Sequence, residues 1–194
     1  MNDKYQPCPC GSGRKFKFCC YETIASPGSV SNYEFPVHRC FANLNWQEQG
    51  LAQVVVVREM PNLTYRMGVY LADVFCLGVK DTFVHSGVNY EELKAFLRRS
   101  PMPFHEIAYE DARSIVLGAV EYARQLGFEP PRDWASSKSI LESERSFDNK
   151  FKFGKDGKPF YIQGPADNPK KIMAKLEPLV KQGKADFLTV VDLG

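Results

Sequence analysis

From residue 37 onward, apolar and polar residues follow patterns that predict strands and helices. The β-branched run Leu51–Glu59 (LAQVVVVRE) predicts a strand that ends before the Met-Pro-Asn of residues 60–62. Tyr65–Val84 is a second β-rich stretch that is too long for one strand, and we expect it to divide near Gly78. These two stretches predict three strands.

The strongest helical pattern covers residues 109–126, where apolar residues recur at i, i+3, i+4 and i+7 and Gly127 follows. Asn89 is an N-cap candidate for a helix over residues 90–99, which carry apolar residues on one side. Both segments are predicted to be amphipathic helices.

Two shorter helices are expected elsewhere. Residues 38–49 predict a short helix closed by Gly50, and Asp133 is placed to cap another helix that ends near Leu141. Further along, an Asp-Gly pair between alternating runs predicts a β-hairpin over residues 150–163 (KFKFGKDGKPFYIQ).

The chain is expected to close with a helix and a strand. Asn168 and Pro169 are typical of a helix start, Gly183 of its end, and residues 186–193 predict a strand. Apolar residues make up 44% of the chain and aromatic residues 13%, enough for a packed core. Residues 37–194 are therefore predicted to form a single mixed α+β domain.

The segment before this domain has a different composition. Residues 25–36 are rich in Ser, Pro and Gly without periodicity, which predicts a linker, and residues 1–24 form a separate unit rich in cysteine. The fold class expected is α+β, with a small N-terminal zinc knuckle followed by the single domain.

Four of the six cysteines fall within thirteen residues, CPCGSGRKFKFCC, at Cys8, Cys10, Cys19 and Cys20. A segment this short cannot bury a core, so it needs a cross-link. In a reducing compartment a metal is favoured over disulfides, and four thiolates suit a closed tetrahedral Zn²⁺ site. Gly11 and Gly13 let the chain fold back between the two cysteine pairs. The cluster predicts a Cys₄ zinc site; two disulfides or four unrelated thiols are the alternatives.

This cluster resembles the SEC-C motif, a small zinc-binding module known from the C-terminus of the bacterial preprotein-translocation ATPase. The pattern is Cys-x-Cys, eight residues, then Cys followed by Cys or His, and the resemblance covers residues 5–21. It implies a binding role as an adaptor. The rest of the chain is similar to bacterial proteins that carry the same motif. The N-terminal position of this copy differs from the ATPase, so the partner is not carried over.

A basic and aromatic segment lies between the cysteine pairs, and its residues are the candidates for partner binding: Arg14, Lys15, Phe16, Lys17 and Phe18. Such a surface fits an acidic protein or protein complex, or else a nucleic acid or the ribosome. The net charge of the whole chain, +2, does not indicate a class of partner. Residues 145–184, however, hold ten basic against four acidic side chains, which is compatible with an acidic or phosphate-rich partner.

The hairpin expected over residues 150–163 allows two interpretations. Its aromatic residues alternate with lysines, as in proteins that stack single-stranded bases and follow phosphates. An amphipathic hairpin that buries its aromatic face and exposes its lysines has the same pattern, and we favour this second interpretation. The residues concerned are Phe151, Phe153, Phe160 and Ile162 on one face, and Lys150, Lys152, Lys155 and Lys158 on the other face and the turn.

Catalytic candidates are few, and no residue is assigned a catalytic role. Asp73 and Asp81 are eight residues apart, so on an unbroken strand they share a face, and with Glu110 or Asp111 they are candidates for a divalent-metal nuclease site. A bulge near Gly78 would place the two carboxylates on opposite faces of the sheet. The simpler interpretation is that these acidic residues lie at turns or strand ends without a catalytic role.

The remaining reactive side chains have structural interpretations. His38, His85 and His105 fall in predicted helix starts or loops without ligand spacing, which favours surface or capping roles. Cys40 and Cys76 are expected to be buried structural thiols.

The sequence predicts neither a membrane span nor an export signal. Its longest apolar run is interrupted by Asp73 and is shorter than the about 18 residues that a span requires. The N-terminus lacks a basic region followed by an apolar one, so a cytoplasmic location is expected.

Three functions follow from these patterns. A zinc-binding adaptor that docks a macromolecular partner is favoured. The alternatives are a nucleic-acid or ribosome-associated binding protein, and a metal-dependent phosphodiesterase or nuclease.

Overall fold

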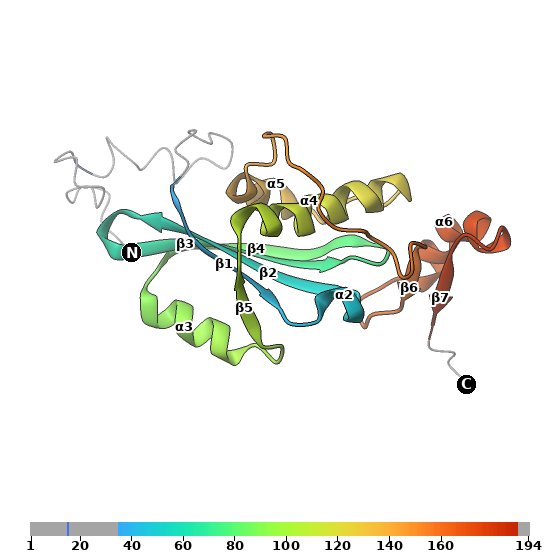
Figure 1. Ribbon diagram of the computed structural model, residues 1–194, viewed down its shortest axis with the longest axis horizontal. Coiled ribbons are helices and arrows are strands. Elements are labelled where there is room, and N and C mark those ends of the chain that lie inside the picture. Colours follow the sequence, from blue (N-terminus) through green and yellow to red (C-terminus); the bar gives the residue numbers. More distant parts are fainter. Residues whose placement is uncertain (1–14, 16–34, 190–194) are drawn as a thin grey trace.

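The computed structural model describes Lys15 and residues 35–189 (Figure 1). Its largest element is an antiparallel sheet with the strand order β4-β3-β2-β1-β5. The strands are β1 (Val37–Asn43), β2 (Leu51–Met60), β3 (Thr64–Asp73), β4 (Gly78–Val88) and β5 (Phe104–Ile107). The strands predicted over residues 51–59 and 65–84 are confirmed, including the division near Gly78.

The sheet is covered on both faces, which explains the continuous apolar run in β2. Helix α4 (Tyr109–Gln125) and the short α5 (Trp134–Ser137) pack on one face, and α3 (Tyr90–Arg99) lies on the other (Figure 1). Val54 and Val56 belong to the cluster under α4, whereas Val55 and Val57 belong to the cluster on the α3 face. A strand buried on both faces needs no polar alternation.

The cap predicted for α3 is confirmed. The Asn89 side chain accepts a hydrogen bond from the backbone N–H of Glu92 at 2.9 Å, and the Glu92 carboxylate accepts one from the N–H of Asn89 at 2.8 Å. This reciprocal pair satisfies two backbone donors that the first turn would otherwise leave open. The predicted helix over residues 109–126 is confirmed as α4.

The helix predicted over residues 38–49 is wrong. Residues 37–43 form β1, and only α2 (Trp46–Gln49) is helical, although Gly50 does close it with a positive φ of 73°. β1 pairs with β2 on one side and β5 on the other, so backbone pairing on both edges outweighs the local helical pattern. The segment expected as one helix to Leu141 is α5 followed by a 3₁₀ turn, η3 (Lys138–Leu141).

The hairpin predicted over residues 150–163 is also wrong beyond its turn. Asp156 and Gly157 have positive φ values of 52° and 80°, and a single bridge joins Lys155 to Lys158. The strand that follows, β6 (Phe160–Ile162), instead pairs in parallel with β7 (Asp186–Leu188). β7 confirms the start of the last predicted strand, and residues 190–193 of that prediction lie outside the described residues.

The helix predicted after Asn168 is confirmed as α6 (Pro169–Lys181), and the Asn168 side chain accepts a hydrogen bond from the N–H of Lys171 at 3.1 Å. Leu176 of α6 and Tyr161 of β6 pack against Cys76, in the turn between β3 and β4. This third apolar cluster attaches α6 and β6 to one end of the sheet, and β7 is joined to it by pairing with β6 (Figure 1).

Candidate functional site

Asp73 ends β3, and its carboxylate holds the turn into β4. Oδ1 accepts hydrogen bonds from the backbone N–H of Phe75 at 3.0 Å and of Cys76 at 2.9 Å. The side chain is buried. Burial raises the pKa of Asp73 to about 6, although the two N–H donors act in the opposite direction. This is the geometry of an Asx turn, in which the carboxylate stabilises local backbone.

Asp81, the other carboxylate of the nuclease hypothesis, lies in different surroundings. It is exposed on β4 opposite Leu71, and its Oδ1 accepts a hydrogen bond from the N–H of Thr82 at 2.8 Å. The strand register shifts between this pair and the next, Ala72 opposite Val79, so Lys80 is an extra residue in β4. The bulge removes the even spacing on which the shared face was argued.

The acidic residues of α4 are engaged elsewhere. Asp111 accepts a hydrogen bond from Lys150 Nζ at 2.7 Å, and Glu110 accepts one from Arg113 Nη1 at 3.1 Å. Within residues 35–189, no three His, Cys, Asp or Glu side chains come together as a metal site would require. The described part of the chain therefore does not assemble the carboxylates of the nuclease hypothesis.

All three histidines lie on strands, not in the helix starts or loops that the sequence predicted. His38 pairs with Glu59, Nδ1 to Oε1 at 2.9 Å, and its ring lies 4.7 Å from that of Tyr65. His85 is exposed and makes an edge contact with Phe83. His85 and His105 are exposed, as predicted, whereas His38 is half-buried, and the positions of all three on strands correct the predicted elements.

Cys40 and Cys76 are buried, as predicted. Burial raises the pKa of each thiol to about 12, so both are protonated near neutral pH. Thiolate is the nucleophilic form of cysteine, and these two side chains do not supply it.

The aromatic residues of segment 150–163 point into the core. Phe153 is 8% exposed and stacks on Tyr122 with ring centroids 5.8 Å apart. Its ring lies so close to Gly118 that a Cβ atom there would come within 2.6 Å. Phe151 contacts Trp46 edge-on. These rings are not available for base stacking, so their predicted burial is confirmed. The amphipathic hairpin itself is not formed, and Ile162, assigned to the buried face, is 40% exposed.

Several lysines of the same segment are held by neighbouring groups. Lys150 pairs with Asp111, Lys155 Nζ lies 4.4 Å from the centroid of the Phe160 ring, and Lys158 Nζ donates to the carbonyl of Gly183 at 3.1 Å. These contacts tie the segment to α4 and to the chain just before β7.

Sequence reasoning missed a buried arginine, Arg58, which is 4% exposed on β2. Its guanidinium donates to the carbonyls of Ile140 and Phe35, to the Tyr109 hydroxyl and to Glu142, at distances between 2.6 and 2.9 Å. The sequence signal that could have identified it is the position of this arginine directly after four valines, in a strand that is buried on both faces.

Glu142 completes this network. Burial acts to raise its pKa, but hydrogen bonds from Arg58 and Arg145 outweigh that effect and hold the pKa of Glu142 below its usual value. Arg113, 1% exposed, donates to the carbonyls of Leu141 and Arg145 at 2.9 and 2.7 Å. Both buried arginines thus fix the loop after η3.

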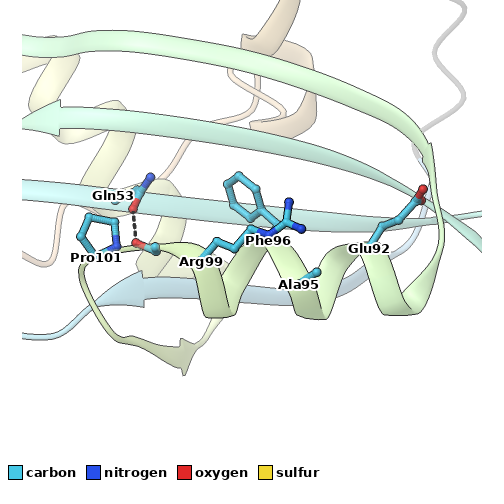
Figure 2. Close-up of a pocket in the computed structure, with 7 residues that line it drawn as sticks. Gln53, Glu92, Ala95, Phe96, Arg99 and Pro101 are labelled. Atoms are coloured by element: carbon cyan, nitrogen blue, oxygen red, sulfur yellow. Dashed lines mark hydrogen bonds between the residues drawn. The ribbon is translucent and has the colours of Figure 1, made fainter.

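A groove of about 360 Å³ lies along α3 (Figure 2), lined by Gln53, Glu92, Ala95, Phe96, Arg99, Ser100 and Pro101. Ser100 Oγ donates to Gln53 Oε1 at 3.0 Å, and Glu92 belongs to the capping box of α3. These polar groups serve the fold. The groove lining does not include a base beside a nucleophile.

The cysteine cluster itself lies outside the described residues, and so do four of the five predicted partner-binding residues; the fifth, Lys15, is exposed. A family model for the SEC-C motif matches residues 6–22. The chain carries a SEC-C motif. No curated protein and no solved structure matches the chain.

The SEC-C motif is a zinc-binding module, and the donor set of this copy suits that metal. Cys8, Cys10, Cys19 and Cys20 offer four soft thiolates, the set typical of closed structural zinc sites. The resemblance stated from the sequence is therefore confirmed for the motif. Within residues 35–189, every helix is too short or too polar to cross a bilayer.

Proposed function

We propose that this chain is a zinc-binding adaptor in which Cys8, Cys10, Cys19 and Cys20 hold a single Zn²⁺. The observation that carries the proposal is the SEC-C motif at residues 6–22 with all four thiol donors in place. A reducing cytoplasm suits this role, because it keeps the thiols free for the metal.

A closed four-thiolate site has no open coordination position, so its metal does not activate water. What the metal provides is a fixed shape for the chain between the ligands. That stretch presents the basic side chains of Arg14, Lys15 and Lys17 together with the rings of Phe16 and Phe18. The proposed function is therefore binding without chemistry.

An acidic protein surface is the partner that this composition favours. Positive charge speeds the approach of an acidic partner, and the two rings add apolar contact area. A nucleic-acid partner has less support, because the second aromatic and basic segment, residues 150–163, has the rings of Phe151 and Phe153 packed in the core.

The proposed architecture separates the zinc module from the domain. Residues 25–36 would be the linker and residues 37–194 the domain. The three apolar clusters of the described residues draw on positions from Val37 to Val180, which supports a domain that folds by its own packing. A chain that starts at Val37 should be soluble and unfold cooperatively.

Affinity capture with the zinc-loaded full chain tests the binding role. The baits are the wild type, the charge reversal Lys15→Glu with Lys17→Glu, and the surface reversal Lys170→Glu with Lys171→Glu as the matched control. We expect the wild type and the control to retain the same protein partner in extracts treated with nuclease, and the reversal at Lys15 and Lys17 to lose it.

Two results would contradict the proposal. Capture that disappears after nuclease treatment would identify nucleic acid as the partner. Capture that is equally strong with both reversed baits would show that the zinc module does not provide the contact.

A further inference from the structure

The C-terminal ribbon of β6 and β7 is closed on one side and open on the other. β6 is the inner strand, since the N–H of Phe160 donates to the carbonyl of Phe75 at 3.1 Å in the β3–β4 turn. Among the described residues, β7 pairs with β6 alone and is the outer strand (Figure 1). Parallel strands normally lie inside larger sheets, and a sheet of two strands is marginal by itself.

The hydrogen bonds of the ribbon define which backbone groups of β7 face outward. The N–H of Asp186 donates to Pro159, and the carbonyl of Leu188 accepts from Gln163. Alternate residues of a strand point toward the same neighbour, so Asp186 and Leu188 face β6. Phe187 and Thr189 therefore present their N–H and C=O groups to the open edge.

Apolar side chains are exposed beside this edge. Ile162, Phe187 and Leu188 are 40%, 43% and 61% exposed, and they are three of the seven large apolar side chains exposed in the described residues. Ile162 and Leu188 are register partners, so they lie on the same face of the ribbon. Exposed apolar residues grouped at an unpaired strand are typical of an interaction surface.

The charge around the ribbon is positive. Residues 150–189 contain nine lysines against four acidic residues. Lys158 and Lys184 are exposed next to β7, and Lys158 contacts the carbonyl of Gly183, three residues before the strand. Acidic side chains on an added strand would be attracted here, whereas a second copy of the same basic ribbon would be repelled.

We propose that the open edge of β7 binds an extended segment of another protein, in which apolar residues alternate with Asp or Glu. The segment adds a third strand through the backbone groups of Phe187 and Thr189, and its apolar residues cover Ile162 and Leu188. This is strand addition at a sheet edge. The site goes beyond the adaptor role of the zinc module and does not depend on it.

A pair of synthetic peptides tests this site on the full chain. The first is the capped heptapeptide EVEIEVE, and the second, KVKIKVK, keeps the apolar residues and reverses the charge. We expect the acidic peptide to bind at least about tenfold more tightly than the basic one in fluorescence anisotropy, and added salt to reduce the difference. Hydrogen exchange at the amides of Phe187 and Thr189 should slow when the acidic peptide binds.

Matched variants locate the binding. Leu188→Ser removes an exposed leucine from the ribbon and should weaken binding of the acidic peptide by about tenfold. Leu63→Ser removes a leucine that is 90% exposed on η2 (Pro61–Leu63) and should leave the affinity unchanged. Both side chains are on the surface, so both variants should fold.

Three results would overturn the proposal. Equal affinity for the two peptides would show that charge does not select the partner. Protection of amides away from β7 would show that the peptide binds elsewhere. Protection of Phe187 and Thr189 that rises with protein concentration without peptide, together with a dimer in sedimentation, would identify a second copy as the occupant.

Discussion

The SEC-C segment and the α+β domain differ in the side chains that are available to stabilise them. Residues 6–22 are too few to bury a core, and we propose that their four cysteines bind a metal instead. The domain buries three apolar clusters around a sheet that is covered on both faces. The recognisable motif thus lies in a short cysteine-rich segment, whereas the domain uses buried polar side chains to hold its own backbone.

Arg58 and Asp73 show this use of polar groups most clearly. Arg58 ties Phe35, Ile140 and Glu142 to β2, and Asp73 holds the turn after β3. Both side chains are buried, and Asp73 is a candidate metal ligand by its sequence position. Changes at such residues should therefore alter the stability of the domain and leave the zinc content of the chain at about one equivalent.

Arg58→Met should have the largest effect. The change leaves the carboxylate of Glu142 buried without its main partner, and losing one member of a buried ion pair costs about 3–5 kcal/mol. Chemical denaturation should show this loss of unfolding free energy. Adding Glu142→Gln should restore part of it, because the second change removes the unpaired charge.

Arg39→Met is the matched control, because Arg39 pairs with Glu106 on the surface at 3.3 Å. Exposed pairs contribute about 1 kcal/mol or less. A loss of zinc from the Arg58→Met protein while its domain remains folded would show that the two regions depend on each other.

Asp73→Asn should have the next largest effect on the free energy of unfolding, and the size of this effect depends on pH. The native pKa is about 6 against 3.8 for an ordinary aspartate, so the unfolded chain releases this proton first. Between pH 4 and 6 the unfolded state then binds fewer protons than the native state, and the contribution of Asp73 to stability falls as pH rises. The difference between the two pKa values corresponds to about 3 kcal/mol.

Asparagine retains an oxygen for the two backbone N–H donors and does not ionise. The Asp73→Asn protein should therefore gain stability relative to the wild type as pH rises from about 4 to about 6, with the difference constant above that range. Denaturation at several pH values measures this, with Asp81→Asn as the exposed control. A difference that does not vary with pH would contradict the buried, proton-retaining Asp73.

Asn89→Ala should have a smaller effect. It removes the side-chain acceptor of the capping box at α3, which is worth about 1 kcal/mol. The melting temperature of the domain should fall by a few degrees. Glu91→Ala, in the first turn but outside the reciprocal pair, serves as the control, and an equal fall in both proteins would argue against the cap.

Sequence reasoning identified the elements whose signals are local. The valines of β2, the cap of α3 and the apolar stripe of α4 each depend on neighbouring residues, and all three appear in the structure. The turn predicted at Asp156 and Gly157 is also confirmed. Such signals identify an element without showing its distant partner.

The errors concern pairing between distant residues. β1 is a strand because β2 and β5 flank it. β6 pairs with β7, more than twenty positions along the chain, and not with the segment before the Asp-Gly turn as a hairpin would require. For candidate sites, the even spacing of Asp73 and Asp81 did not anticipate the bulge at Lys80. The cysteine spacing does predict the SEC-C motif, since the whole pattern lies within residues 6–22 and depends on no distant partner.

The most direct test of the central comparison is thermal unfolding of the full chain with and without a zinc chelator, with bound zinc measured in parallel. Trp46 and Trp134, the two tryptophans of the chain, are both buried in the domain and report its unfolding. We predict that the chelator removes about one equivalent of zinc and leaves the tryptophan transition at the same temperature. A chain that carries no zinc, or a domain that unfolds when the zinc is removed, would contradict this account.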